Sequence, residues 1–129
     1  MKVVEINGSS DADDLDSLET ILTKKYRNGY NSFWLSHGSQ EYPALSLLVK
    51  DDLATLTYIP NDQSAGYRSI GNIPTLKPGY STSFSISNSP ADDVVVLNEA
   101  ILPFSIALKV AKEFFVSERL PQSVQWLEL

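Results

Sequence analysis

Few residues of the types that carry out catalysis occur in this chain of 129 residues. It has no cysteine and one histidine, His37, which excludes Cys–His catalysis and histidine-rich metal sites. His37 precedes Gly38 in a polar stretch, where a histidine is most simply a solvated turn residue. The chain also lacks the Gly-x-Ser-x-Gly motif of a serine hydrolase. These residues predict no catalytic, metal-binding or cofactor-binding site.

Paired carboxylates are the remaining groups that could support acid–base chemistry. They occur as Asp51-Asp52 and as Asp92-Asp93, the second pair after a Ser-Pro step. Adjacent aspartates are frequent in tight turns, because their side chains accept hydrogen bonds from nearby main chain. No motif links the two pairs, so a small carboxylate hydrolase is an alternative that rests on residue type alone.

The polar stretch after Ile59 holds residue types suited to binding another protein. Tyrosine and arginine are enriched at interface hot spots, and loops on a rigid sheet frequently carry binding residues. The alternative is structural, with Tyr67 packed inward and Arg68 paired to a nearby acid. We predict a partner-binding surface in this loop, joined by a pair at a neighbouring sheet edge: Asp62, Tyr67, Arg68 and Ser69, with Asp51 and Asp52.

The charge of the chain favours a basic protein partner. Its formal net charge is −6 and its pI about 4.6, and residues 1–19 hold Lys2 against six carboxylates, a net of −5. These acids are either a solvated helix start or a patch for a basic partner. An acidic protein is a poor ligand for nucleic acid, which requires positive charge. Nucleic acid, membranes and small-molecule substrates are therefore not expected ligands.

Length and composition predict a single globular domain over residues 1–129. Hydrophobic residues make up 43% and charged residues 20% of the chain, which is ordinary for a folded domain. The apolar run at the start of the chain is too short for a signal sequence. No run approaches the roughly 18 apolar residues of a membrane span. The absence of cysteine is compatible with a reducing compartment. We expect a cytoplasmic protein.

Hydrophobic spacing and turn residues predict an α+β fold. An antiparallel meander, with a helix from each end of the chain packed on it and a short strand at the C-terminus, accounts for the pattern. Asn28-Gly29 is the expected end of the first helix. The expected strands are 3–6, 31–36, 44–50, 53–59, 82–86, 94–97 and 124–127; the expected helices are 14–26 and 101–117; residues 60–81 are expected to be a loop.

Several stretches of the chain match a known family in order and spacing over residues 33–129. They are Phe33–Leu35, Tyr42–Leu45, Asp52–Tyr58, Ala65–Ser69, Gly71-Asn72 and Ala107–Leu129. The most specific part is the ending, with Glu113-Phe114-Phe115, Leu120-Pro121, Trp126 and Glu128-Leu129. In these residues the chain resembles immunity protein family one of bacterial polymorphic-toxin systems. Among its members, it looks closest to those that neutralise cytidine-deaminase toxins acting on DNA.

The resemblance implies a non-catalytic inhibitor that binds a cognate toxin domain and covers its active site or substrate channel. The matching aromatic residues of the C-terminal third are expected to form the core and not the binding surface. A different class of function stays open, since secretion chaperones are also small, acidic α+β proteins. A chaperone would bind an unfolded or N-terminal segment of its client, whereas an immunity protein binds the folded toxin domain.

Overall fold

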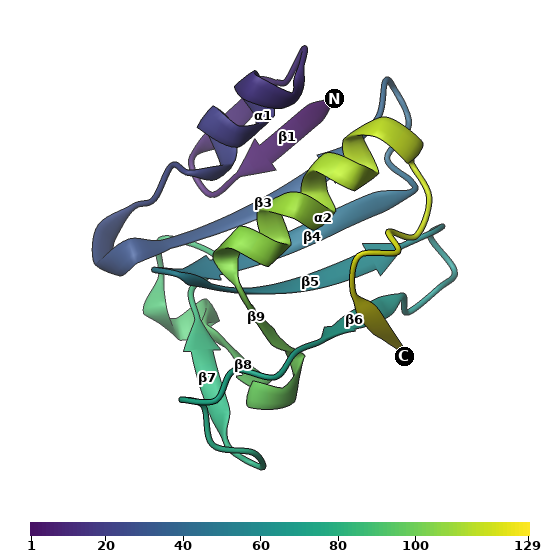
Figure 1. Ribbon diagram of the computed structural model, residues 1–129. Coiled ribbons are helices and arrows are strands. Elements are labelled where there is room, and N and C mark those ends of the chain that lie inside the picture. The colour runs from purple at the N-terminus through teal and green to yellow at the C-terminus, as the bar shows by residue number, and fades with distance from the viewer.

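The computed structural model describes residues 1–129, except for the side chain of Arg27. Two helices lie on one face of an antiparallel sheet, which confirms the expected α+β architecture (Figure 1). Within the described backbone the main sheet has the strand order β10-β6-β5-β4-β3-β1-β2, with β9 also beside β5. The strands are β1 (Lys2–Glu5), β2 (Gly8–Asp11), β3 (Tyr30–Ser36), β4 (Ala44–Lys50), β5 (Leu53–Ile59), β6 (Tyr67–Ile70), β7 (Ser81–Phe84), β8 (Val94–Leu97), β9 (Ile101–Pro103) and β10 (Gln125–Glu128), and the helices are α1 (Leu15–Leu22) and α2 (Phe104–Ser117).

The centre of the sheet is the meander β3–β4–β5, which follows the expected strands closely. Leu45, Leu47 and Val49 of β4 are fully buried at alternate positions, as expected where one face of a strand meets the core. Asp51 and Asp52 form the turn between β4 and β5, where Lys50 pairs with Leu53. The prediction that this aspartate pair turns a hairpin is therefore confirmed.

Helix α1 begins where an aspartate caps it and ends earlier than expected. The Asp14 carboxylate accepts a hydrogen bond from the main-chain N of Ser17 at 2.8 Å, and Ser17 Oγ accepts one from Asp14 N at 3.1 Å. These reciprocal bonds form a capping box. The helix stops at Leu22 and not near residue 26, since the carbonyl of Lys24 accepts a bond from Asn31 Nδ2 (2.8 Å). A tertiary contact thus replaces the last helical turn.

Helix α2 starts at Phe104, three residues later than predicted. Ile101–Pro103 instead form β9, which pairs with the first half of β5. Ala107, Val110, Ala111 and Phe114 are fully buried along one face of α2. Together with Leu18 and Leu22 of α1, they close the main core against the sheet.

The structure also corrects the expectation that residues 60–81 form only a loop. Tyr67–Ile70 are strand β6, which pairs with β5 on one side and with β10 on the other. Gly8–Asp11, which lie outside the strands expected from the sequence, form β2 beside β1. All four residues of β2 are exposed, so no alternation of apolar residues marked it. The partner that holds β6 in the sheet, β10, lies more than fifty residues away in sequence.

A smaller core lies on the face of the sheet opposite the helices. Strands β7 and β8 form a two-stranded sheet whose Phe84 and Val96 are buried with Ile101. Leu48 and Leu53 of the main sheet pack against this cluster. The short connection Asn98–Ala100 then returns the chain from β8 to β9. In the described part of the chain, neither helix has the length and apolar character needed to cross a membrane.

Candidate functional site

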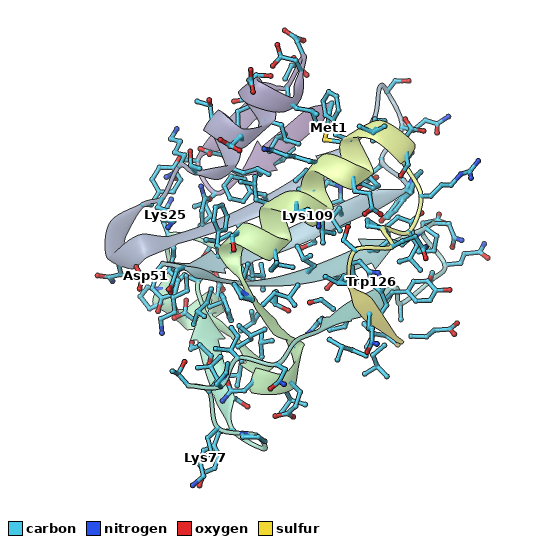
Figure 2. The ribbon with its side chains drawn as sticks, in the orientation of Figure 1. Met1, Lys25, Asp51, Lys77, Lys109 and Trp126 are labelled. Carbon is cyan, nitrogen blue, oxygen red and sulfur yellow. The ribbon has the colours of Figure 1, made fainter. Side chains whose placement is uncertain are left out.

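The residues predicted to bind a partner lie at two ends of strand β5. Asp51 and Asp52 form the turn before β5, whereas Asp62 lies in the connection after it and the remaining three are in β6. Because β5 has seven residues, the two groups are roughly 20 Å apart. Figure 2 shows Asp51 at one end of the sheet and Trp126, whose strand neighbours β6, toward the other. The structure therefore does not gather the six residues into one cluster.

Two of the predicted binding residues in β6 face the helices. Ser69 is 1% exposed; its hydroxyl accepts a hydrogen bond from Leu56 N (3.1 Å) and donates one to the Ala100 carbonyl (2.9 Å). The Tyr67 ring packs on the main core, 6.3 Å from the ring of Tyr58. Ser69 therefore supports the sheet and exposes almost none of its surface, and Tyr67 is half-buried, as the structural alternative supposed.

Arg68 points to the opposite face of the sheet from Tyr67 and Ser69. Its Nε atom donates a hydrogen bond to Thr57 Oγ1 at 3.1 Å. Among the described residues no carboxylate lies close enough to form an ion pair with it. The alternative in which Arg68 pairs with a nearby acid is thus not realised, and Arg68 lines a hollow on this side of the sheet.

That hollow, here called the apolar groove, separates β8 from β6 and β10. It has a volume of about 400 Å³ and is lined mainly by apolar side chains. None of these apolar residues was predicted from the sequence to bind a partner. The run Val94–Leu97 was expected only to be a strand, and its pattern does not distinguish exposed from buried positions. The lining side chains are Arg68, Ile70, Val95, Leu97, Leu127 and Leu129, joined by Ser69, Glu99 and Ala100.

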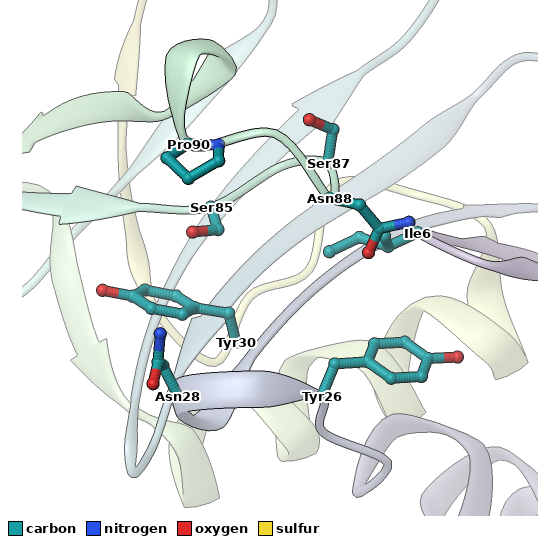
Figure 3. Close-up of a pocket in the computed structure, with 8 residues that line it drawn as sticks. All are labelled: Ile6, Tyr26, Asn28, Tyr30, Ser85, Ser87, Asn88 and Pro90. Carbon is teal, nitrogen blue, oxygen red and sulfur yellow. The ribbon is translucent and has the colours of Figure 1, made fainter.

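A second hollow lies near the other end of β5, close to Asp51. The main-chain N of Asp51 donates to the carbonyl of Gly29 at 2.9 Å, and the neighbouring Asn28 lines this hollow of about 310 Å³. Figure 3 shows the Tyr30 ring between Asn28 and Ser85, while the Tyr26 hydroxyl points away from them. Its walls are mostly amides, hydroxyls and aromatic rings: Ile6, Tyr26, Asn28, Tyr30, Ser85, Ser87, Asn88 and Pro90.

A nearly buried carboxylate lies behind this second hollow. The Glu5 side chain is 7% exposed, accepts hydrogen bonds from Tyr26 and Asn31, and has Lys24 Nζ at 3.3 Å. Burial alone raises the pKa of Glu5, but the bonds from Tyr26, Lys24 and Asn31 outweigh it and bring the pKa below its usual 4.5. The same contacts with Tyr26 and Glu5 raise the pKa of Lys24. This network joins β1 to the segment after α1.

The acidic residues near the start of the chain lie on the outside of β2 and α1. Asp11, Asp13, Asp14 and Asp16 are exposed. Glu19 pairs instead with Lys112 of α2, with Nζ and Oε1 2.5 Å apart. Hydrogen bonds from the Ser17 main chain and hydroxyl lower the pKa of Asp14. This end of the molecule therefore presents concentrated negative charge to solvent.

His37 is not the solvated turn residue expected from the sequence. Its ring packs 5.0 Å from the ring of Phe114, and its side chain is 21% exposed. Nε2 lies 3.0 Å from the Phe115 carbonyl, and Nδ1 lies 3.4 Å from a carboxylate oxygen of Glu118. The histidine thus holds the C-terminal end of α2 against the sheet. Among the described residues, no group of three or more acids and histidines is placed to hold a metal ion.

Comparison with curated proteins finds a relative that matches almost the whole chain. It is the double-stranded DNA deaminase immunity protein of Burkholderia cenocepacia (strain H111), 25% identical over 125 residues. The match covers 97% of this chain and 97% of the relative. The chain is a distant, full-length homologue of that immunity protein. No family model matches the chain. The resemblance to immunity proteins of DNA deaminase toxins is confirmed through this homologue.

Proposed function

We propose that this protein is an immunity protein that binds and inhibits a cognate DNA deaminase toxin domain. The observation that carries the proposal is the match over 97% of both chains to a protein named for this role. A match of this extent includes both ends of β5 and both helices, so it is not limited to one shared motif. The protein would act by binding and would catalyse no reaction.

Charge supports a partner of this kind. A toxin that acts on DNA needs positive charge in its cleft to hold the phosphate backbone. This chain carries −6, and its exposed acids on β2 and α1 add a concentrated negative surface. Opposite charge speeds the encounter of two proteins and aligns them as they approach. We therefore propose that the protein covers the active site or the DNA channel of the toxin.

The proposed contact surface lies on the side of the sheet reached by Arg68, with Asp62 at its rim. Asp51 and Asp52 lie roughly 20 Å away along β5. A standard interface covers about 800 Å² on each partner, a patch roughly 30 Å across. Both ends of β5 therefore fit within one interface. Tyr67 lies on the other face of the sheet, against the main core, and Ser69 is nearly fully buried, so both support this surface from within the fold.

The proposal is tested by mixing the purified protein with the folded toxin domain encoded by the neighbouring gene. Isothermal titration calorimetry should show a stoichiometric complex, and a deamination assay on double-stranded DNA should lose its activity as the complex forms. Adding DNA in excess should slow inhibition, because DNA and the protein would compete for one cleft. A toxin that neither binds nor loses activity would overturn the proposal.

The same material separates this function from that of a secretion chaperone. A chaperone would bind the unfolded toxin or its N-terminal segment and leave the activity of the folded domain unchanged. An immunity protein would bind the isolated folded domain and would not need the preceding segments. The comparison therefore uses two forms of the toxin, the folded C-terminal domain and the remainder of the chain.

A further inference from the structure

The apolar groove is a concentration of exposed apolar surface. Ile70, Val95, Leu97, Leu127 and Leu129 are 41%, 71%, 57%, 57% and 53% exposed, respectively, and all line it. Soluble proteins expose single apolar side chains routinely, but a contiguous apolar patch with a polar rim marks an interaction site. The other exposed large apolar residues in the described part of the chain are spread over β1, both helices and the segments flanking β7.

The walls of the groove point to an extended occupant. β10 is the terminal strand of the main sheet, and β8 is one of the two strands of the small sheet (Figure 1). Each of these strands therefore has one side on which its main-chain groups pair with no other strand within the described residues. Such edges accept an extended segment of another chain through main-chain hydrogen bonds, while pockets receive its alternate side chains.

The polar groups of the groove are mostly satisfied within the protein. The Ala100 carbonyl accepts hydrogen bonds from both Thr55 and Ser69, and the Ser69 hydroxyl is committed to Leu56 and Ala100. The charged residues left to direct an occupant are Arg68 and Glu99. The Glu99 carboxylate also accepts a hydrogen bond from Gly79 N at 2.8 Å. A small ligand would find few anchors, but a peptide with charged and apolar side chains would find matching ones.

Net charge distinguishes the two proteins that such a groove could bind, a second copy of this chain and a toxin. A second copy of this chain would bring another −6 against the first, and like charge opposes association. A segment of a DNA-acting toxin would bring basic residues, one of which could pair with Glu99. We infer that the groove receives an extended segment of the toxin domain that carries apolar side chains and a basic residue. This inference rests on the proposed function.

The test uses two valines that differ in position but are matched in exposure. Val95 lines the groove and is 71% exposed, and Val116 lies on α2 and is 74% exposed. Val95→Asp should weaken binding to the folded toxin domain by about tenfold or more, mainly through faster dissociation, because it places a charge in an apolar contact. Val116→Asp should stay within about twofold of the original protein. Thermal unfolding of both variants verifies that they fold.

A second groove variant and the oligomeric state complete the experiment. Leu97→Ser should weaken binding in the same direction as Val95→Asp, without adding charge. If the original protein binds the toxin and both groove variants bind equally well, the groove inference is wrong while the proposed function stands. If the original protein does not bind the toxin, both are wrong. A dimer in sedimentation that Val95→Asp dissociates would assign the groove to a second copy and overturn the inference.

Discussion

The hydroxyl of Ser69 donates a hydrogen bond to the carbonyl oxygen of Ala100 at 2.9 Å, where β6 and β9 part along the edge of β5. β9 pairs with the first half of β5 and β6 with the second half. Between them, Leu56 N finds its acceptor in Ser69 Oγ, and Thr55 Oγ1 joins Ser69 at the Ala100 carbonyl (2.8 Å). Side chains thus complete the hydrogen bonding at a fork in the sheet.

Ser69→Ala should therefore reduce stability and not directly remove a contact with a partner. The change leaves the buried Leu56 N–H without an acceptor, which costs about 1–3 kcal/mol in the free energy of unfolding. Chemical denaturation measures this loss. Ser83→Ala, at an exposed position of β7, is the control and should change stability by about 0.5 kcal/mol or less. Unchanged stability together with lost toxin binding would instead assign Ser69 to the interface.

Gly71 should tolerate no side chain, because β6 ends against the strand that leads into α2. A Cβ built on Gly71 would lie 1.8 Å from the carbonyl oxygen of Ile101. Gly71→Ala must push β9 away from this position, at a cost of about 3 kcal/mol. Gly8→Ala is the matched control, since a Cβ there meets nothing within 4 Å. The midpoints of thermal unfolding of the two variants compare them, and equal midpoints would show that the backbone yields freely.

The elements with strong local patterns were predictable from the sequence. The meander strands alternate in burial, and α2 repeats its apolar residues at helical spacing, so each indicates its own structure. β2 was missed because it is short and polar, and β6 because its four residues are too few to show a pattern. The pairing of both strands depends on the rest of the fold. Ile101–Pro103 form a strand because they pair with β5, although the apolar residues of this stretch run into those of the helix without a break in the sequence.

The candidate site was predictable only in part, for a related reason. Residue type suggested Arg68 as a binding residue in a loop, whereas the structure places it in strand β6, where it lines the apolar groove. Residue type also suggested that Ser69 was exposed, since serine is usually a surface residue. A sequence does not distinguish a buried polar side chain that hydrogen-bonds the main chain of a sheet from one that is exposed to solvent. The exposure of Val95 and Leu97 was not predictable either. An apolar run in a sequence does not reveal which of its side chains the fold leaves exposed.

Stability should depend on the ionisation of Glu5. The hydrogen bonds from Tyr26, Lys24 and Asn31 favour its charged form, so its pKa is lower in the folded protein than in the unfolded chain. The unfolded chain then binds the proton more readily, and the stabilisation is present above the usual pKa of 4.5 and lost as pH falls through the folded value. Chemical denaturation at a series of pH values from neutral to acid should show this decline.

The variant Glu5→Gln isolates this contribution. It keeps the size of the side chain but removes its titration, so it should be less stable near neutral pH and should lose less stability on acidification. Gly8→Ala provides the control, because it removes no titrating group and its added Cβ meets nothing within 4 Å, so the slope with pH should stay as in the original protein. An acid dependence of Glu5→Gln equal to that of the original protein would mean that other carboxylates cause the decline.

Trp126 should hold strand β10 in place from the face of the sheet opposite the groove. Its ring packs on the main core and its Nε1 donates to the Pro121 carbonyl at 2.7 Å, while the next residue, Leu127, lines the groove. Trp126→Ala removes the anchor of β10, and should cost about 3 kcal/mol. It should also weaken toxin binding, as the wall formed by β10 loosens. Trp126→Phe loses one hydrogen bond, worth about 1 kcal/mol, but keeps most of the packing.

These two variants separate the positioning of β10 from stability alone. Binding is measured at a temperature where both remain folded, as judged by circular dichroism. Trp126→Phe should bind the toxin nearly as well as the original protein, whereas Trp126→Ala should dissociate faster, as Val95→Asp does. If Trp126→Ala is destabilised but binds with unchanged affinity, β10 supports the fold without forming part of the binding surface, and the toxin then contacts the groove on the side of β6 and β8 alone.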